Sequence, residues 1–208
     1  MPPFPVYLFD LDGTLLDSAP DICGAIIGAL EGTGCRPVTQ AELTRYIGLH
    51  LLDTFGDLLP AATPDEIDEL IRKYRIIYPA RGHKLTKLYP GVQEALTALP
   101  GRKSTATTKA TPTTRTVLEL FGLIDCFDHV QGTDGFPHKP APDVILKSLE
   151  FFGVSPADVL FVGDSPADME AGRRAGVKTA AVTYGYGAHE DLARWNPDYW
   201  LTDLRQLL

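Results

Sequence analysis

Two aspartates, Asp10 and Asp12, stand one residue apart near the start of the chain, directly after the apolar run 6–9. Such a run is typical of a buried strand that ends in a loop, and Gly13 and Thr14 supply the turn. In that loop one carboxylate can be held ionised by a divalent metal and attack phosphorus. The second acid can protonate the leaving alkoxide and later deprotonate the attacking water. An Asp-x-Asp-Gly sequence taken alone also fits a simple turn.

A second pair of acids follows a later apolar run. Residues 159–162 lead into Asp164, and Asp168 comes four residues further on. Asp164 falls where a metal ligand from a neighbouring parallel strand should stand, and hard Mg²⁺ prefers oxygen ligands while keeping several waters. We expect Asp168 to brace those waters, although an acid near a helix N-terminus is also favourable by itself.

Two further segments carry groups suited to phosphate. Prolines flank Lys139 and would aim its ammonium with little entropic loss, so that it offsets the repulsion between a phosphate and Asp10. The segment 104–109 ends another predicted strand with small hydroxyl residues. There the Thr107 hydroxyl and an adjacent backbone amide can hold phosphate oxygens. Each feature alone also fits a solvated lysine or an ordinary strand end.

The elements that must position these groups alternate between strand and helix. Short apolar runs predict strands at 6–9, 104–107, around 129–130, 159–162 and 179–182. Between the later runs lie helical patterns at 112–121, 142–152 and 166–175, each with a proline near its first turn. This alternation predicts an α/β fold whose core is a doubly wound, Rossmann-like parallel sheet.

The stretch from Ser18 to Leu88 breaks the alternation and contains no convincing strand. Helical periodicity occurs at 22–30, 41–47, 51–59 and 64–78. A helical segment placed after the first strand predicts a small domain inserted at a strand end, where ligands bind in such sheets. We therefore expect an α/β catalytic core of residues 1–16 and 86–208 and an inserted α-helical cap of residues 17–85. Gly13, Gly82 and Gly91 lie near the connections and would let the cap hinge.

The overall charge and the cysteines limit the partners. A net charge of -8 opposes binding to nucleic acid or to an anionic membrane. The three cysteines form no Cys-x-x-Cys pair, so neither a disulfide framework nor a zinc site is indicated. No signal peptide or membrane-spanning run is visible. We expect a cytoplasmic monomer or homodimer that acts on a small phosphorylated metabolite.

Together the four chemistry-bearing segments resemble the haloacid dehalogenase superfamily of phosphatases in order and spacing, through most of the chain. The segment from Phe9 to Asp21 is similar to the opening of phosphoglycolate phosphatases. Gly163 to Ser165 and Thr183 to Gly187 are similar to their later part.

The resemblance implies that Asp10 is the nucleophile and Asp12 the general acid/base. It implies Mg²⁺ bound by the Asp10 carboxylate, the Asp12 backbone carbonyl and Asp164, with Asp168 behind these ligands. Phosphate would be bound by Gly13, Thr107, Thr108 and Lys139. Thr108 stands where these phosphatases commonly have asparagine, which keeps the backbone contact but assigns no role to the side chain.

The activity so implied is Mg²⁺-dependent hydrolysis of a small phosphate monoester, 2-phosphoglycolate, through an aspartyl-phosphate. Pyrophosphate, nucleoside monophosphates or sugar phosphates could fit a related cap. A sugar phosphomutase and a regulator that binds a phosphorylated metabolite are further alternatives. Cap residues should set specificity, and candidates for touching a substrate carboxylate are Arg45, Gly48, His50 and Arg72.

Other activities on such a fold are disfavoured by particular residues. A haloacid dehalogenase has no use for a second acid such as Asp12. A phosphonate-cleaving relative would need a cap lysine for a Schiff base, and the expected cap holds few lysines. No Gly-x-Gly-x-x-Gly follows the first strand, as a NAD-dependent oxidoreductase would require. A regulator without activity should lose a catalytic acid, and this chain keeps all of them.

Overall fold

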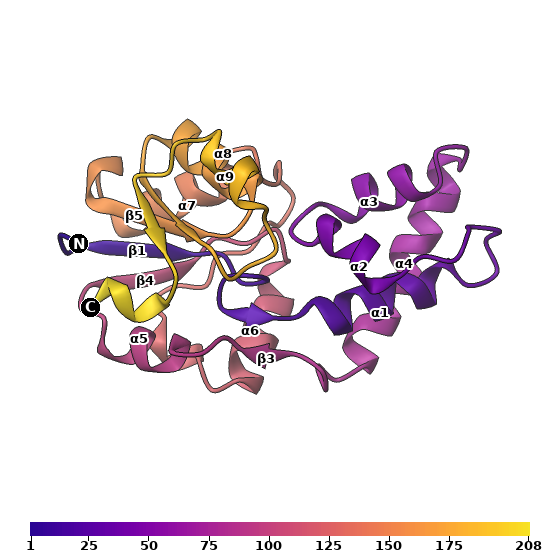
Figure 1. Cartoon of the computed structure of the whole chain (residues 1–208), viewed down its shortest axis with the longest axis horizontal. Helices are drawn as coiled ribbons and strands as arrows, with labels where there is room; N and C mark the ends of the chain where they lie inside the picture. Colours follow the sequence, from indigo (N-terminus) through magenta and orange to yellow (C-terminus); the bar gives the residue numbers. More distant parts are fainter.

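The computed structural model describes all 208 residues and shows an α/β part beside a helical part (Figure 1). The main sheet has five strands in the order β4-β1-β5-β6-β7, and every neighbouring pair is parallel. The strands are β4 (Arg102–Thr105), β1 (Val6–Phe9), β5 (Val159–Gly163), β6 (Lys178–Val182) and β7 (Tyr199–Leu201). The predicted α/β fold with a parallel sheet is confirmed.

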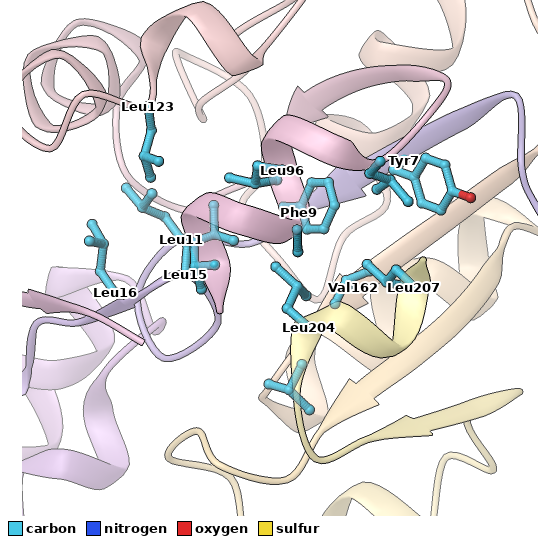
Figure 2. Packing of buried hydrophobic residues seen from close by; sticks show 14 of the residues in the cluster. Tyr7, Phe9, Leu11, Leu15, Leu16, Leu96, Leu123, Val162, Leu204 and Leu207 are labelled. Carbon is cyan, nitrogen blue, oxygen red and sulfur yellow. The ribbon is translucent and has the colours of Figure 1, made fainter. Parts of the chain in front are cut away.

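Helices cover both faces of this sheet, because successive strand residues point to opposite sides. Tyr7 and Phe9 of β1 pack in the cluster that includes α5 (Val92–Ala98) and α6 (Thr111–Leu120), as part of Figure 2 shows. Val6 and Leu8 pack in the cluster of the opposite face with α7 (Asp143–Phe152) and α8 (Pro166–Ala175). A short helix, α9 (His189–Ala193), precedes β7. The whole of β1 is therefore buried, which explains its unbroken apolar sequence.

The helical part has a hydrophobic core of its own. It consists of α1 (Ala19–Leu30), α2 (Gln40–Leu43), α3 (Leu51–Leu58) and α4 (Pro64–Ala80), here called the helical unit. Ile26 of α1, Phe55 of α3 and Leu70 of α4 lie in one buried cluster that contains no residue of the main sheet. Helix α4 begins with a capping box, in which the Thr63 hydroxyl accepts from the Glu66 N–H and the Glu66 carboxylate accepts from the Thr63 N–H.

Two short strands join the helical unit to the sheet. Strand β2 (Leu16–Asp17) pairs antiparallel with β3 (Lys87–Leu88), so that both connections run side by side. The sequence pattern missed this pair because two residues carry no periodicity.

Three other elements differ from expectation. No strand forms around residues 129–130, where His129 makes a single bridge to Ser104 and the prediction is wrong. Helix α2 ends at Leu43 and continues as a 3-10 turn at Thr44–Tyr46, instead of running to residue 47. Strand β7 was not predicted, because only one of its three residues is buried. No helix in the chain has the length and apolar character needed to cross a membrane.

Candidate active site

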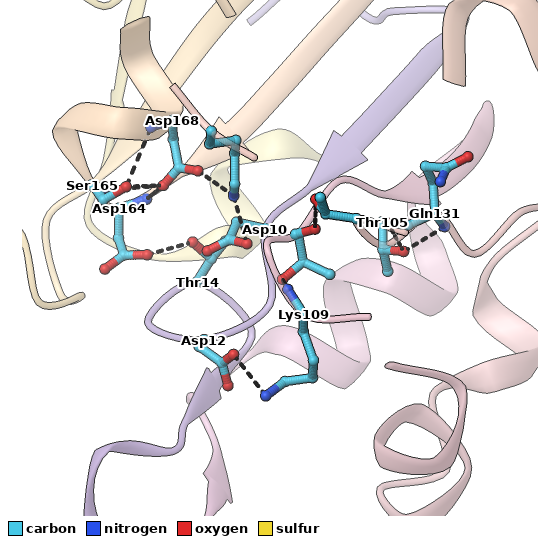
Figure 3. A network of polar contacts seen from close by, with 12 residues as sticks. Asp10, Asp12, Thr14, Thr105, Lys109, Gln131, Asp164, Ser165 and Asp168 are labelled. Atoms are coloured by element: carbon cyan, nitrogen blue, oxygen red, sulfur yellow. Dashed lines mark hydrogen bonds and ion pairs between the residues drawn. The ribbon is translucent and has the colours of Figure 1, made fainter. Parts of the chain in front are cut away.

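The predicted acids meet at the carboxyl edge of the main sheet (Figure 3). Asp10 directly follows β1 and Asp164 directly follows its neighbour β5, while Asp168 lies in the first turn of α8. Carboxylate oxygens of these three residues lie within 4.8 Å of one another, and all three side chains are buried. Parallel pairing of β1 with β5 brings two loops together that are 150 residues apart in the sequence.

Lys139 completes this cluster from the loop before α7. Its Nζ lies 2.8 Å from Asp10 Oδ1 and 2.5 Å from Asp168 Oδ1, and its side chain is only 1% exposed. The structure therefore gives no support to the reading of Lys139 as a solvated lysine. Asp10 Oδ2 accepts no hydrogen bond from the protein and is left available.

Asp168 holds both the lysine and the Asp164 loop. Its Oδ2 accepts hydrogen bonds from the backbone N–H of Asp164 (3.2 Å) and Ser165 (2.9 Å) and from the Ser165 hydroxyl (2.6 Å). Ser165 in turn accepts from the Asp168 N–H, which makes the capping box that starts α8. The observed role of Asp168 is to position neighbouring groups; its bracing of metal-bound water stays a prediction.

Asp164 is fitted into a tight backbone cradle. Thr14 Oγ1 donates to its Oδ1 (3.0 Å) and the Tyr186 N–H donates to its Oδ2 (2.8 Å). A Cβ at Gly13 would lie 2.2 Å from Asp164 Oδ2, and one at Gly185 would lie 2.3 Å from Asp164 Cβ. Gly13 also has a φ of +94°, so that only glycine suits this close approach. Its N–H donates to the Leu16 carbonyl (2.8 Å), which leaves its predicted phosphate contact without a free donor.

The cluster carries more negative than positive charge. Burial raises the pKa of Asp10 to about 6, although Lys139 opposes the shift. Burial also raises the pKa of Asp164 well above its ordinary value, and the carboxylates of Asp168 and Asp10 add to this. Three buried carboxylates thus face one ammonium. Such a set of oxygen donors fits a divalent cation, because two positive charges balance the excess and Mg²⁺ prefers oxygen ligands.

Asp12 lies on the same loop but has different partners. The Ser18 hydroxyl donates to its Oδ1 (2.7 Å), and Lys109 Nζ lies 3.1 Å from its Oδ2. Lys109 also donates to the Tyr78 hydroxyl of the helical unit (3.1 Å). Burial would lower the pKa of Lys109, but Asp12 and Tyr78 together keep it above its ordinary value. Lys109 was not among the predicted site residues, although its place just after Thr108 at a strand end could have identified it.

Unpaired donors lie beside the acids. Thr107 is buried, and its hydroxyl accepts from the Lys109 N–H (3.3 Å). The Thr108 hydroxyl is buried without any hydrogen-bond partner. The backbone N–H groups of Leu11, Asp12 and Thr108 donate to no acceptor in the protein. Free donors on neighbouring strand-end loops are suited to the oxygens of an anion.

A cavity of about 1000 Å³ separates this site from the helical unit. Of the four suggested cap residues, Gly48 and His50 line it. The other two do not: Arg45 pairs with Asp57 and Arg72 pairs with Glu69.

Arg75 of α4 also lines the cavity and makes no ion pair. Arg75 was not predicted from the sequence, although its position three residues before Tyr78 places both on one face of α4.

Known proteins resemble the chain over nearly its full length. The family model of haloacid dehalogenase-like hydrolases matches residues 7–182. A phosphoglycolate phosphatase of Vibrio vulnificus (strain YJ016) is 36% identical, over 96% of this chain and 92% of that protein. The pyrophosphatase PpaX of Anoxybacillus flavithermus (strain DSM 21510 / WK1) is 35% identical, over 97% of this chain and 94% of that protein. A solved structure of a haloacid dehalogenase-like family hydrolase from Streptococcus pneumoniae has a TM-score of 0.89 at 27% identity and covers 98% of this chain and 96% of its own. The expected resemblance is confirmed, and the chain belongs to the haloacid dehalogenase-like hydrolase family.

Proposed function

We propose that this phosphatase hydrolyses 2-phosphoglycolate in the presence of Mg²⁺, through an aspartyl-phosphate on Asp10. The observation that carries the proposal is the state of the Asp10 carboxylate. Lys139 donates a hydrogen bond to Oδ1 of Asp10, while Oδ2 of Asp10 accepts no hydrogen bond. Asp10 also lines the cavity. A buried carboxylate fixed in this way is oriented for attack on phosphorus.

In the first step, Asp10 attacks phosphorus and the bond from phosphorus to the ester oxygen breaks. The electron pair of that bond goes to the leaving alkoxide, which takes a proton from Asp12. The Ser18 hydroxyl and Lys109 fix the Asp12 carboxyl for this transfer. Lys139 balances charge that would otherwise repel the incoming phosphate.

In the second step, Asp12 takes a proton from water as the water oxygen attacks the phosphorus of the aspartyl-phosphate. The bond between phosphorus and Asp10 breaks, so that inorganic phosphate leaves and the Asp10 carboxylate is restored. Mg²⁺, held by the Asp10 carboxylate, the Asp12 backbone carbonyl and Asp164, would stabilise the negative charge on the phosphoryl oxygens.

The phosphoryl oxygens would be held by the free donors described above. These are the Thr108 hydroxyl and the N–H groups of Leu11, Asp12 and Thr108, with Thr107 beside them. Thr108 thereby gains a side-chain role that the resemblance alone did not assign. The role rests on the buried and unpartnered state of its hydroxyl.

The helical unit would act as a cap that closes over the cavity, with residues 17–85 forming that domain. Arg75 faces the cavity as an unpaired cation, and a guanidinium binds a carboxylate with two parallel hydrogen bonds. This is the feature that favours a substrate with a second anionic group at the end remote from the reacting phosphate, as in 2-phosphoglycolate. We place the reaction in the cytoplasm.

Pyrophosphate is the second candidate substrate, because its far phosphoryl group would also pair with Arg75, and because one relative, PpaX of Anoxybacillus flavithermus, is named a pyrophosphatase. Phosphate release should be measured for 2-phosphoglycolate, for pyrophosphate and for ethyl phosphate, which lacks the second anion. We expect the highest kcat/KM for 2-phosphoglycolate and loss of activity with EDTA. Equal rates for ethyl phosphate, or rates that EDTA leaves unchanged, would contradict the proposal. Retention of the phosphoryl group on a sugar product would indicate a mutase instead.

A further inference from the structure

A second group of metal-ligating side chains lies at the rim of the cavity, apart from the aspartate cluster. It consists of His50 and Asp53 from the helical unit and His138 from the core loop that precedes Lys139. One potential ligand atom from each residue lies within 4.8 Å of the other two. Both histidines line the cavity. Because His50 comes from the helical unit and His138 from the core, the group spans the two parts of the molecule.

The contacts within the group already bring its donors together. The rings of His50 and His138 stack with centroids 4.4 Å apart and an interplanar angle of 15°. His138 Nε2 lies 3.1 Å from Asp53 Oδ2. His50 precedes α3 and Asp53 lies in its first turn, so the helix start fixes their spacing.

We propose that His50, Asp53 and His138 bind a zinc-like transition-metal dication that bridges the helical unit and the core. Two imidazoles and one carboxylate suit Zn²⁺, whereas the all-carboxylate cluster around Asp10 suits Mg²⁺. In a tetrahedral zinc site, ligand atoms about 2.1 Å from the metal stand about 3.4 Å apart. The donors now lie within 4.8 Å of one another and must move closer, and the two imidazoles must rotate out of their near-parallel stack so that a nitrogen lone pair of each points at the metal. A water completes the fourth position.

Nearby charged groups both favour and oppose the binding of a cation at this site. The Asp53 carboxylate attracts a cation, while Arg75, which also lines the cavity near His50, repels it. The His50 Nδ1 accepts a hydrogen bond of 3.3 Å from the Leu52 N–H, which leaves its Nε2 for the metal. Because one ligand comes from the core and two come from the helical unit, the bound cation would hold the cavity closed at its rim.

The test is equilibrium dialysis against Zn²⁺ with millimolar Mg²⁺ present, so that the aspartate cluster is already occupied. We expect one bound zinc per chain. The variants His50→Gln, Asp53→Asn and His138→Gln should each weaken binding by at least about tenfold, since each removes one ligand. His189→Gln is the matched control, because His189 stacks on Trp200 away from the cavity.

Equal zinc affinity in the three variants and the wild type would overturn the proposal, because the zinc would then lie elsewhere. Failure of the wild type to retain zinc would also overturn it. Asp53 is 55% exposed on its side chain, so Asp53→Asn keeps the test usable if His50→Gln disturbs the start of α3. The measurement needs no substrate and is therefore independent of the proposed phosphatase reaction.

Discussion

The two walls of the cavity differ in how their charges are arranged. On the core wall the charged side chains are buried and paired: Lys139 contacts Asp10 and Asp168, and Lys109 contacts Asp12. On the helical wall Arg75 is exposed and has no ion-pair partner. Buried charges need partners to offset their desolvation, which fixes the geometry of the core wall. An exposed cation is free to meet a ligand, so we propose that the core wall carries the chemistry and the helical wall the selectivity.

The largest effect is expected on the core wall with Asp10→Asn. This change keeps the size of the side chain but removes the proposed nucleophile. We expect phosphate release to fall by at least about four powers of ten, because removing a covalent catalytic group has effects of this order. The rate of phosphate release under saturating 2-phosphoglycolate and Mg²⁺ is the measurement. Activity of Asp10→Asn close to the wild type would remove the proposed mechanism.

Removing the second acid should have a smaller effect. For Asp12→Ala we expect kcat to fall by roughly two to four powers of ten, the usual contribution of general acid/base catalysis. With a substrate whose leaving group needs no protonation, such as p-nitrophenyl phosphate, Asp12→Ala should slow the first step less. Burst kinetics would then show the aspartyl-phosphate accumulating. If Asp12→Ala keeps full kcat with 2-phosphoglycolate, Asp12 is not the acid.

On the helical wall, Arg75→Ala should act on selectivity rather than on chemistry. We expect kcat/KM for 2-phosphoglycolate to fall by about 10- to 100-fold, because a hydrogen bond between charged groups contributes about 1.5 to 3 kcal/mol. The value for ethyl phosphate should stay unchanged. Arg72→Ala is the matched control on the same helix, since Arg72 pairs with Glu69 and does not line the cavity. Equal losses in both variants would show that Arg75 does not read the substrate.

The smallest effect concerns the junction between the two parts. Asp21 is buried and accepts hydrogen bonds from the N–H of Leu85 (2.9 Å), the N–H of Thr86 (2.8 Å) and Arg81 Nε (3.2 Å). It thereby ties the start of α1 to the segment that follows α4. We expect Asp21→Asn to lower the free energy of unfolding at pH 7 by about 2 to 3 kcal/mol, because it removes charge-assisted hydrogen bonds.

The effect of Asp21 should depend on pH in a fixed direction. Burial alone would raise its pKa, but the hydrogen bonds from Leu85 and Thr86 and the charge of Arg81 hold it below its ordinary value. A depressed pKa stabilises the fold above the unfolded-state pKa of about 3.9, and this contribution is lost as the pH falls through the folded-state value. Urea unfolding of wild type and Asp21→Asn at pH 7, 5 and 3.5 should show a difference that shrinks only toward the lowest pH. A difference that grows on acidification would contradict this account.

Local pattern in the sequence was sufficient for four of the five strands of the main sheet and for the acids at its edge. An apolar run that ends in an acid marks a buried strand and its loop, and parallel pairing then brings Asp10 and Asp164 together. The prolines that open α6 and α8 and the glycines around Asp164 are local signals of the same kind. These features need no knowledge of how distant side chains pack.

Contacts across the cavity were decided only by the tertiary structure. The sequence offered several basic residues on the helices without showing which of them face the core. Helix α4 turns Arg75 toward the cavity and Arg72 toward Glu69. Likewise, the contact of His50 with His138 depends on how the helical unit sits against a loop 88 residues later. Which side chains meet there depends on helix rotation and docking, which a one-dimensional pattern of residue types does not specify.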